Sequence, residues 1–137
     1  VYVNGFKAIE VSNDGHGGCD RQHTYPEMQK GLLQEVNKYC VKTFGTEKYE
    51  WGEVDIDLEH WCQKKMYEHV DQKKLKRDMK TKFICVDIDK NELYAYAKKG
   101  HSDVAFRNHM NKNHPKDVCL NFLEFDLAWK FYKSGVV

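Results

Sequence analysis

A run of apolar residues at three- and four-residue steps constrains the fold of this chain more than any other feature. This spacing places all of them on one face of a helix. They are Met28, Leu32, Leu33, Val36, Tyr39 and Cys40. Thr24 and Glu27 have the spacing of a capping box, Pro26 falls in the first turn, and Gly45 supplies a stop. We therefore expect a helix over about Tyr25–Thr43.

Several other segments have the patterns of β-strands. Gly5–Val11 predicts a short first strand, followed by a glycine-rich turn at 13–18. Lys48–Leu58 also predicts a strand, in which a bulge at Gly52 would restore a single apolar face. Thr81–Ile88 and Leu93–Ala97 alternate on either side of a polar turn, which predicts a hairpin.

The remaining segments are less regular. Leu58–Val70 is compatible with a helix or with an irregular excursion, and we expect the lysine-rich stretch through Lys80 to be an exposed loop. His101–Pro115 predicts a polar connection with one helical turn, and Val118–Phe122 predicts a strand. Every second residue of Leu123–Phe131 is apolar, which favours a strand over the alternative of a terminal helix.

Together these elements predict one α+β domain over residues 1–137, with one long helix packed on an antiparallel sheet. The length of 137 residues suits one domain, and a hydrophobic fraction of 41% can fill its core. We expect three helix residues to pack on three sheet residues: Leu32, Leu33 and Val36 on Trp51, Ile84 and Val86. No apolar run approaches the ~18 residues of a membrane span, so no membrane partner is expected.

Charge is unevenly distributed along the chain. Residues 1–60 carry eleven acidic and six basic side chains, whereas residues 61–137 carry ten acidic and sixteen basic ones. Six bases between Lys73 and Lys82 are opposed only by Asp78. Such a run is typical of a nucleic-acid contact or of a solvated surface, and the lack of interleaved aromatic residues favours the surface. RNA is therefore the weaker of the expected partners.

The cysteines and histidines indicate no metal or cofactor. The five cysteines contain no C-x-x-C pair, and the seven histidines form no H-x-x-x-H pair. The cysteines are either buried thiols in a reducing cell or two disulfides and one spare thiol in a secreted protein. Because the sequence begins at Val1 and has only two prolines, we favour secretion after removal of a signal peptide.

Tyr49-Glu50-Trp51 follows the predicted helix closely, and the predicted hairpin and Cys119 come later. This order resembles the small fungal ribonucleases of the T1/N1 type, in which the glutamate of that motif is the general base. The resemblance implies a ribonuclease T1-like fold. It also implies an upstream histidine, an arginine opening the hairpin and a histidine ending it. Here the upstream strand has no room, Lys82 stands at the arginine position, and His101 comes about two residues late. The catalytic set is therefore incomplete, and we assign no catalytic residue.

A ribonuclease-like scaffold without its catalytic residues is similar to the RNase-like secreted effectors of powdery mildew fungi. That resemblance implies a non-enzymatic virulence effector, secreted and delivered into the host cell. Its implied partner is a host plant protein, with an immune receptor of the NLR class as one candidate. The family ties an N-terminal cysteine to a C-terminal one, which would be Cys19 and Cys119 here. This chain lacks the family's aromatic-x-Cys start and runs eighteen residues beyond Cys119.

Two other functions stay open from the sequence. One is an active secreted T1-type ribonuclease that uses Glu50 with His101 and Lys82, and the other is an unrelated secreted binding protein. Among the remaining cysteines, Cys85 lies between apolar residues and is expected to be a buried free thiol. Cys40 and Cys62 would then form a second disulfide, although five cysteines allow fifteen two-bridge patterns.

Overall fold

The computed structural model describes residues 1–26 and 28–135. The contacts of the chain fall into two compact units, Val1–Glu68 and His69–Val137, which we describe one at a time. The single domain expected over residues 1–137 stays a prediction. In the described part of the chain, no helix has both the length and the hydropathy of a membrane span.

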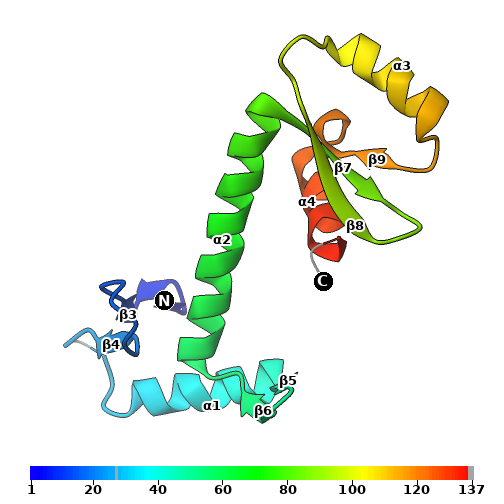
Figure 1. Ribbon diagram of the computed structural model, residues 1–137. Helices are drawn as coiled ribbons and strands as arrows, with labels where there is room; N and C mark the ends of the chain where they lie inside the picture. The colour runs from blue at the N-terminus through cyan, green and yellow to red at the C-terminus, as the bar shows by residue number, and fades with distance from the viewer. Residues whose placement is uncertain (27, 136–137) are drawn as a thin grey trace. The chain divides into compact units, whose positions relative to one another are not determined.

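The first unit contains three antiparallel strand pairs, helix α1 and the beginning of helix α2 (Figure 1). The pairs are β1 (Tyr2–Val3) with β2 (Phe6–Lys7), β3 (Ile9–Ser12) with β4 (Arg21–Thr24), and β5 (Thr46–Tyr49) with β6 (Gly52–Asp55). Helix α1 covers Leu32–Phe44 and helix α2 covers Leu58–Thr81. The predicted turn at 13–18 connects β3 to β4, and the predicted first strand is divided between β2 and β3.

Helix α1 begins later than predicted. Thr24 belongs to β4, where it pairs with Ile9, and so does not cap the helix. Gly31 precedes the helix with a left-handed φ of 89°, a conformation that glycine adopts without strain. The proposed capping box includes Glu27, which lies outside the described residues. The amphipathic pattern therefore identified the helix, whereas the cap signal placed its start about two turns too early.

The segment after α1 is a hairpin and not the single strand predicted over Lys48–Leu58. The stop at Gly45 is confirmed, with φ 73° after the last helical residue. Strand β5 then ends before a turn at Glu50 and Trp51, and Gly52 opens β6 with φ 148°. The apolar residues before and after Gly52 fall on opposite sides of a single predicted strand because the chain reverses there, and not because of a bulge. Tyr49-Glu50-Trp51 is therefore the tip of a hairpin and not part of one strand.

The core of the first unit lies between α1, α2 and the N-terminal strands. Its buried residues are Ala8, Ile9, Cys40 and Leu58. Leu32, Leu33 and Val36 pack against this cluster. The predicted contact of these three residues with Trp51, Ile84 and Val86 is wrong, because Trp51 is exposed and the other two belong to a core of the second unit.

The lysine-rich segment is helical and not the loop that we predicted. It forms the second half of α2, whose first half is Leu58–Val70, the segment left open above. The Asp57 carboxylate caps the helix by accepting the backbone N–H of His60 at 2.9 Å. Leu75 is buried, and Met79 packs beside it one turn later. These two apolar residues anchor a helix whose charged side chains face solvent.

The second unit contains a three-stranded antiparallel sheet. Strands β7 (Lys82–Asp87) and β8 (Glu92–Ala97) form the predicted hairpin, and β9 (Val118–Cys119) pairs with the other edge of β7. The strand order is β8-β7-β9. Asn91 adopts a left-handed φ of 56° in the turn, as a turn asparagine readily does.

The segments around β9 are more helical than the sequence suggested. His101–Pro115 contains helix α3 (Asp103–Asn113), which begins where the Ser102 hydroxyl accepts the N–H of Ala105. The strand predicted over Val118–Phe122 stops after two residues, and the 3-10 turn η1 (Leu120–Phe122) follows.

The strand predicted over Leu123–Phe131 is wrong, and the alternative of a terminal helix is correct. The segment forms most of helix α4 (Phe125–Ser134). Its inward residues recur at helical steps and are Phe125, Ala128, Trp129, Phe131 and Tyr132. Leu127, which completed the alternating pattern, is 45% exposed.

Alternate residues of β7 face two separate cores. Phe83 and Cys85 pack with α3, whereas Ile84 and Val86 pack with α4 and with Leu75 of α2. The described residues thus form four α-helices with antiparallel sheets, which agrees with an α+β class (Figure 1).

The core that lies between β7 and α4 gives the first prediction. Leu120 is fully buried there, so Leu120→Ala should lower the free energy of unfolding by about 2–5 kcal/mol in urea denaturation. Leu127→Ala is the matched control. Because Leu127 is half-exposed, this substitution should lower the free energy of unfolding by about 0.5 kcal/mol or less. Equal losses in the two variants would contradict the helical assignment of α4.

Candidate functional site

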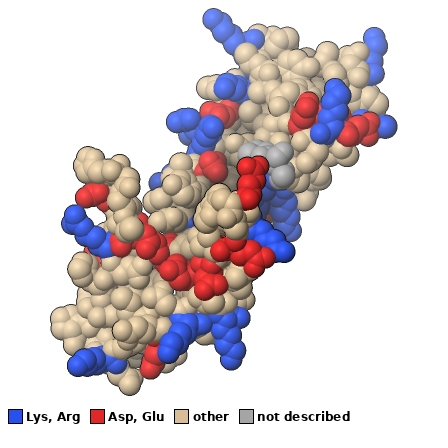
Figure 2. Space-filling model, turned by 60° about the horizontal axis from the view of Figure 1, so that its bottom comes forward, with Lys and Arg blue, Asp and Glu red and all other residues tan. Residues whose placement is uncertain are grey.

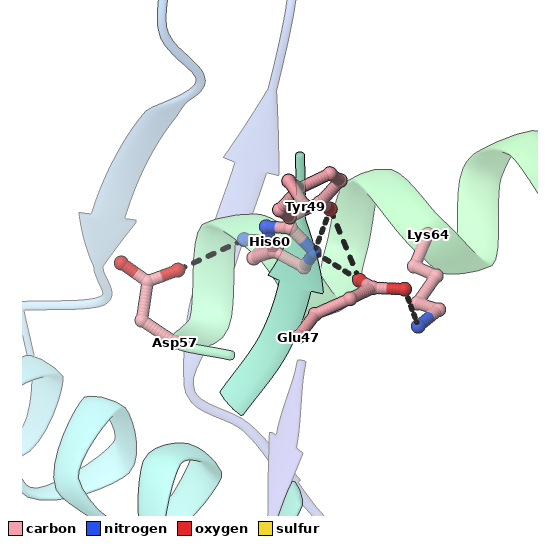
Figure 3. Close-up of polar contacts among 5 residues, drawn as sticks. All are labelled: Glu47, Tyr49, Asp57, His60 and Lys64. Carbon is pink, nitrogen blue, oxygen red and sulfur yellow. Dashed lines mark hydrogen bonds and ion pairs between the residues drawn. The ribbon is translucent and has the colours of Figure 1, made fainter. Parts of the chain in front are cut away.

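Four polar side chains of the first unit converge where β5 meets the start of α2 (Figure 3). Glu47 and Tyr49 are two residues apart on β5 and therefore lie on one face of the strand. His60 and Lys64 are four residues apart on α2 and therefore lie on one face of the helix. We call these four residues the Glu47 cluster.

The Glu47 carboxylate is the centre of the cluster. Its Oε2 atom lies 2.8 Å from Nε2 of His60 and accepts the Tyr49 hydroxyl at 3.1 Å. Its Oε1 atom accepts the Lys64 ammonium at 2.8 Å. The Tyr49 hydroxyl is also 3.2 Å from Nε2 of His60. Both carboxylate oxygens of Glu47 are therefore engaged within the chain.

These contacts shift the pKa values of Glu47 and Tyr49. The hydrogen bond from Lys64, followed by the one from His60, lowers the pKa of Glu47 from 4.5 to about 2. Burial and the adjacent Glu47 carboxylate raise the pKa of Tyr49 above its ordinary value. At neutral pH Glu47 is ionised and Tyr49 is protonated.

This geometry suits a structural clamp better than an acid–base catalyst. A carboxylate with a pKa of about 2 is a weak proton acceptor at neutral pH, far from the range of an efficient general base. The cavity beside the cluster, about 220 Å³, is also lined by Gln63 and Tyr67. The polar side chains that line this cavity bind one another, and their contacts attach the β5–β6 hairpin to α2.

The clamp holds an exposed aromatic pair at the tip of the hairpin. The rings of Tyr49 and Trp51 stack with centroids 5.2 Å apart and an angle of 10° between their planes. Trp51 is 76% exposed. Large aromatic side chains are enriched among the anchor residues of protein interfaces, so this pair is a candidate contact surface.

A second hollow of the first unit, about 520 Å³, lies beside the other side of α2. Its lining includes Tyr2, Val11, Trp61 and Met66. This size falls within the range of small-molecule pockets. Apolar side chains supply about half of its lining, and Asp20 and Lys65 also lie there.

The residues of the ribonuclease resemblance are divided between the two units. Glu50 is an exposed residue of the hairpin turn in the first unit. Lys82 opens β7, and His101 precedes α3, both exposed in the second unit. Neither compact unit contains all three.

The cysteines of the predicted disulfides differ in their surroundings. Cys19 is exposed in the first unit, whereas Cys119 is buried in the second. Cys40 and Cys62 belong to the same core of the first unit, where burial raises the pKa of both thiols. Both pairings stay predictions. Residues 1–26 and 28–135 contain no group of three or more His, Cys, Asp and Glu side chains arranged to hold a metal ion.

Figure 2 shows several Asp and Glu side chains close together on the face in view. Along α2 the side chains of Lys73, Lys76, Arg77 and Lys80 are exposed. Lys76 also lies over the ring of Phe125, with its Nζ atom 4.2 Å from the ring centroid.

Sequence reasoning missed the Glu47 cluster. Its signal was the hairpin turn at Trp51 followed by the helix cap at Asp57, which together return the chain past β5. The prediction of a single strand over Lys48–Leu58 did not include this reversal of the chain. Comparison of the chain with protein-family models, with curated proteins and with solved structures finds no match.

The clamp predicts a pH dependence of stability. Because the pKa of folded Glu47 lies below its ordinary value, its stabilisation is present above pH 4.5 and is lost as the pH falls towards about 2. In urea denaturation, the free energy of unfolding of the wild type should exceed that of Glu47→Gln. The difference should be constant above about pH 5 and should shrink as the pH falls from 4.5 towards about 2. Glu50→Gln, which changes an exposed carboxylate of the same hairpin, should follow the wild type. An advantage over Glu47→Gln that persists unchanged to pH 2 would refute the clamp.

Proposed function

We propose that the chain is a non-enzymatic binding protein that uses the tip of the β5–β6 hairpin as a contact surface. The exposed Trp51, stacked on Tyr49, is the observation that carries the proposal. Burial of such a pair by a partner removes a large apolar area from water while leaving the Tyr49 hydroxyl within the clamp.

The clamp supports this role because it prepares the hairpin before binding. Glu47 is joined to both His60 and Lys64 of α2. A contact loop that is already ordered loses less conformational entropy on association than a mobile one. The same contacts that make Glu47 a poor base therefore favour a rigid binding surface.

The finer proposal is a secreted fungal effector with a ribonuclease-like scaffold, delivered into a plant cell. It rests on the sequence resemblance described above. The proposed partner is a host plant protein, and an immune receptor of the NLR class is one candidate. The exposure of Trp51 supports recognition through the Tyr-Glu-Trp segment itself. The position of Glu50 in an exposed turn, and not on the strand that the ribonuclease motif requires, supports a role without catalysis.

An RNA partner is a second candidate, favoured by the basic side of α2. Lys73, Arg77 and Lys80 follow one another at helical steps and are exposed. Such a row suits phosphate contacts without base readout, and binding through it would weaken steeply with salt.

The partner surface is tested by substitution at the hairpin tip. Trp51→Ala should weaken binding of a plant protein, captured with the wild type, by about 30-fold or more in calorimetry, the loss expected of an anchor residue. Tyr39→Ala is the matched control, because Tyr39 is a 64% exposed aromatic residue of the same unit on α1. Affinity that is unchanged by Trp51→Ala, or reduced equally by Tyr39→Ala, would contradict the proposed surface.

A further inference from the structure

Two buried cysteines of the second unit face each other across neighbouring strands. Cys85 of β7 and Cys119 of β9 are directly opposite in the antiparallel register. Cys85 is fully buried and Cys119 is 7% exposed. Both belong to the core that β7 shares with α3, among Phe83 and Phe106.

The hydrogen bonds around Asn121 show which kind of cross-strand pair this is. The Asn121 side chain accepts the N–H of Ile84 at 2.8 Å and donates to the carbonyl of Lys82 at 2.9 Å. The even-numbered backbone groups of β7 therefore point to the β9 side. Because these groups alternate along a strand, those of Cys85 point to β8. Cys85 and Cys119 are thus a non-hydrogen-bonded pair.

That kind of pair has the spacing of a disulfide. Cα atoms in a non-hydrogen-bonded antiparallel pair lie about 4.5 Å apart, and disulfides span about 4.4–6.8 Å. The two thiols also share a hydrogen bond, which raises the pKa of Cys85 and lowers the pKa of Cys119. Cys119 is therefore the better nucleophile of the two.

We propose that Cys85 and Cys119 form a disulfide when the chain meets a small-molecule disulfide such as oxidised glutathione. The Cys119 thiolate attacks one glutathione sulfur, which forms a mixed disulfide and releases one glutathione thiolate. The Cys85 thiolate then attacks the Cys119 sulfur and releases the second. Two electrons pass to glutathione, and the two cysteine protons are taken up by the two glutathione thiolates.

The disulfide would fasten the weakest edge of the sheet. Strand β9 pairs with β7 through two residue pairs in the described part of the chain, Cys85 with Cys119 and Val86 with Val118. The bond would close the chain around β8 and α3 and restrict the unfolded state. It also excludes the Cys19–Cys119 pairing implied by the sequence resemblance, since one sulfur forms one disulfide.

Peptide mapping distinguishes the two pairings. The full chain is refolded in a buffer of reduced and oxidised glutathione, its free thiols are alkylated, and it is digested with trypsin without reduction. Cleavage after lysine and arginine places Cys85 in residues 83–90, Cys119 in residues 117–130 and Cys19 in residues 8–21. Mass spectrometry should find residues 83–90 joined to residues 117–130 as the main form of both peptides.

Matched variants complete the test. Cys40→Ala changes a buried cysteine of the first unit and should leave the yield of that linked peptide unchanged. Cys85→Ala should leave Cys119 alkylated and not bound to Cys19. The wild type gives the deciding result, because it needs no variant to fold. A disulfide between Cys119 and Cys19 would overturn the proposal. Recovery of both Cys85 and Cys119 in alkylated form would also overturn it.

Discussion

The hydrogen bonds of the Glu47 carboxylate are the interactions on which the proposed contact surface at the tip of the β5–β6 hairpin depends. Glu47 lies on a four-residue strand whose only strand partner among the described residues is the equally short β6. A two-stranded hairpin of this size has little stability of its own in water. The bonds from Glu47 to His60 and Lys64 attach it to α2, a 24-residue helix. Together with the hydrogen bond from the Ile56 N–H to the Gly45 carbonyl at the base of the hairpin, these bonds keep Trp51 in place.

The sequence predicted those parts of the fold in which local pattern and tertiary packing agree. The β7–β8 hairpin was predicted because alternating apolar residues flank a turn that suits Asn91. Helix α4 was missed because chance alternation through Leu127, which is exposed, outweighed the helical spacing of the buried residues. The second half of α2 was missed because Leu75 and Met79 are few among many charges.

The candidate site was less predictable than the fold because it depends on where one chain reversal occurs. Glu47 and His60 are thirteen residues apart and meet only if the chain turns at Trp51. Glu50 drew attention through a family motif that requires a strand, and it lies in the turn instead. The cysteine pair was missed for a similar reason, since the register of β7 with β9 joins residues thirty-four positions apart.

RNA turnover tests most directly whether the Glu47 cluster is a clamp for a binding surface or a catalytic centre. Wild-type protein, Glu47→Gln and Glu50→Gln are incubated with total RNA, and 2′,3′-cyclic phosphate ends are counted. We expect all three to stay at the level of the blank. A positioned acid–base group contributes about 10²–10⁴-fold to a rate. Wild-type turnover that falls by such a factor in either variant would contradict the account.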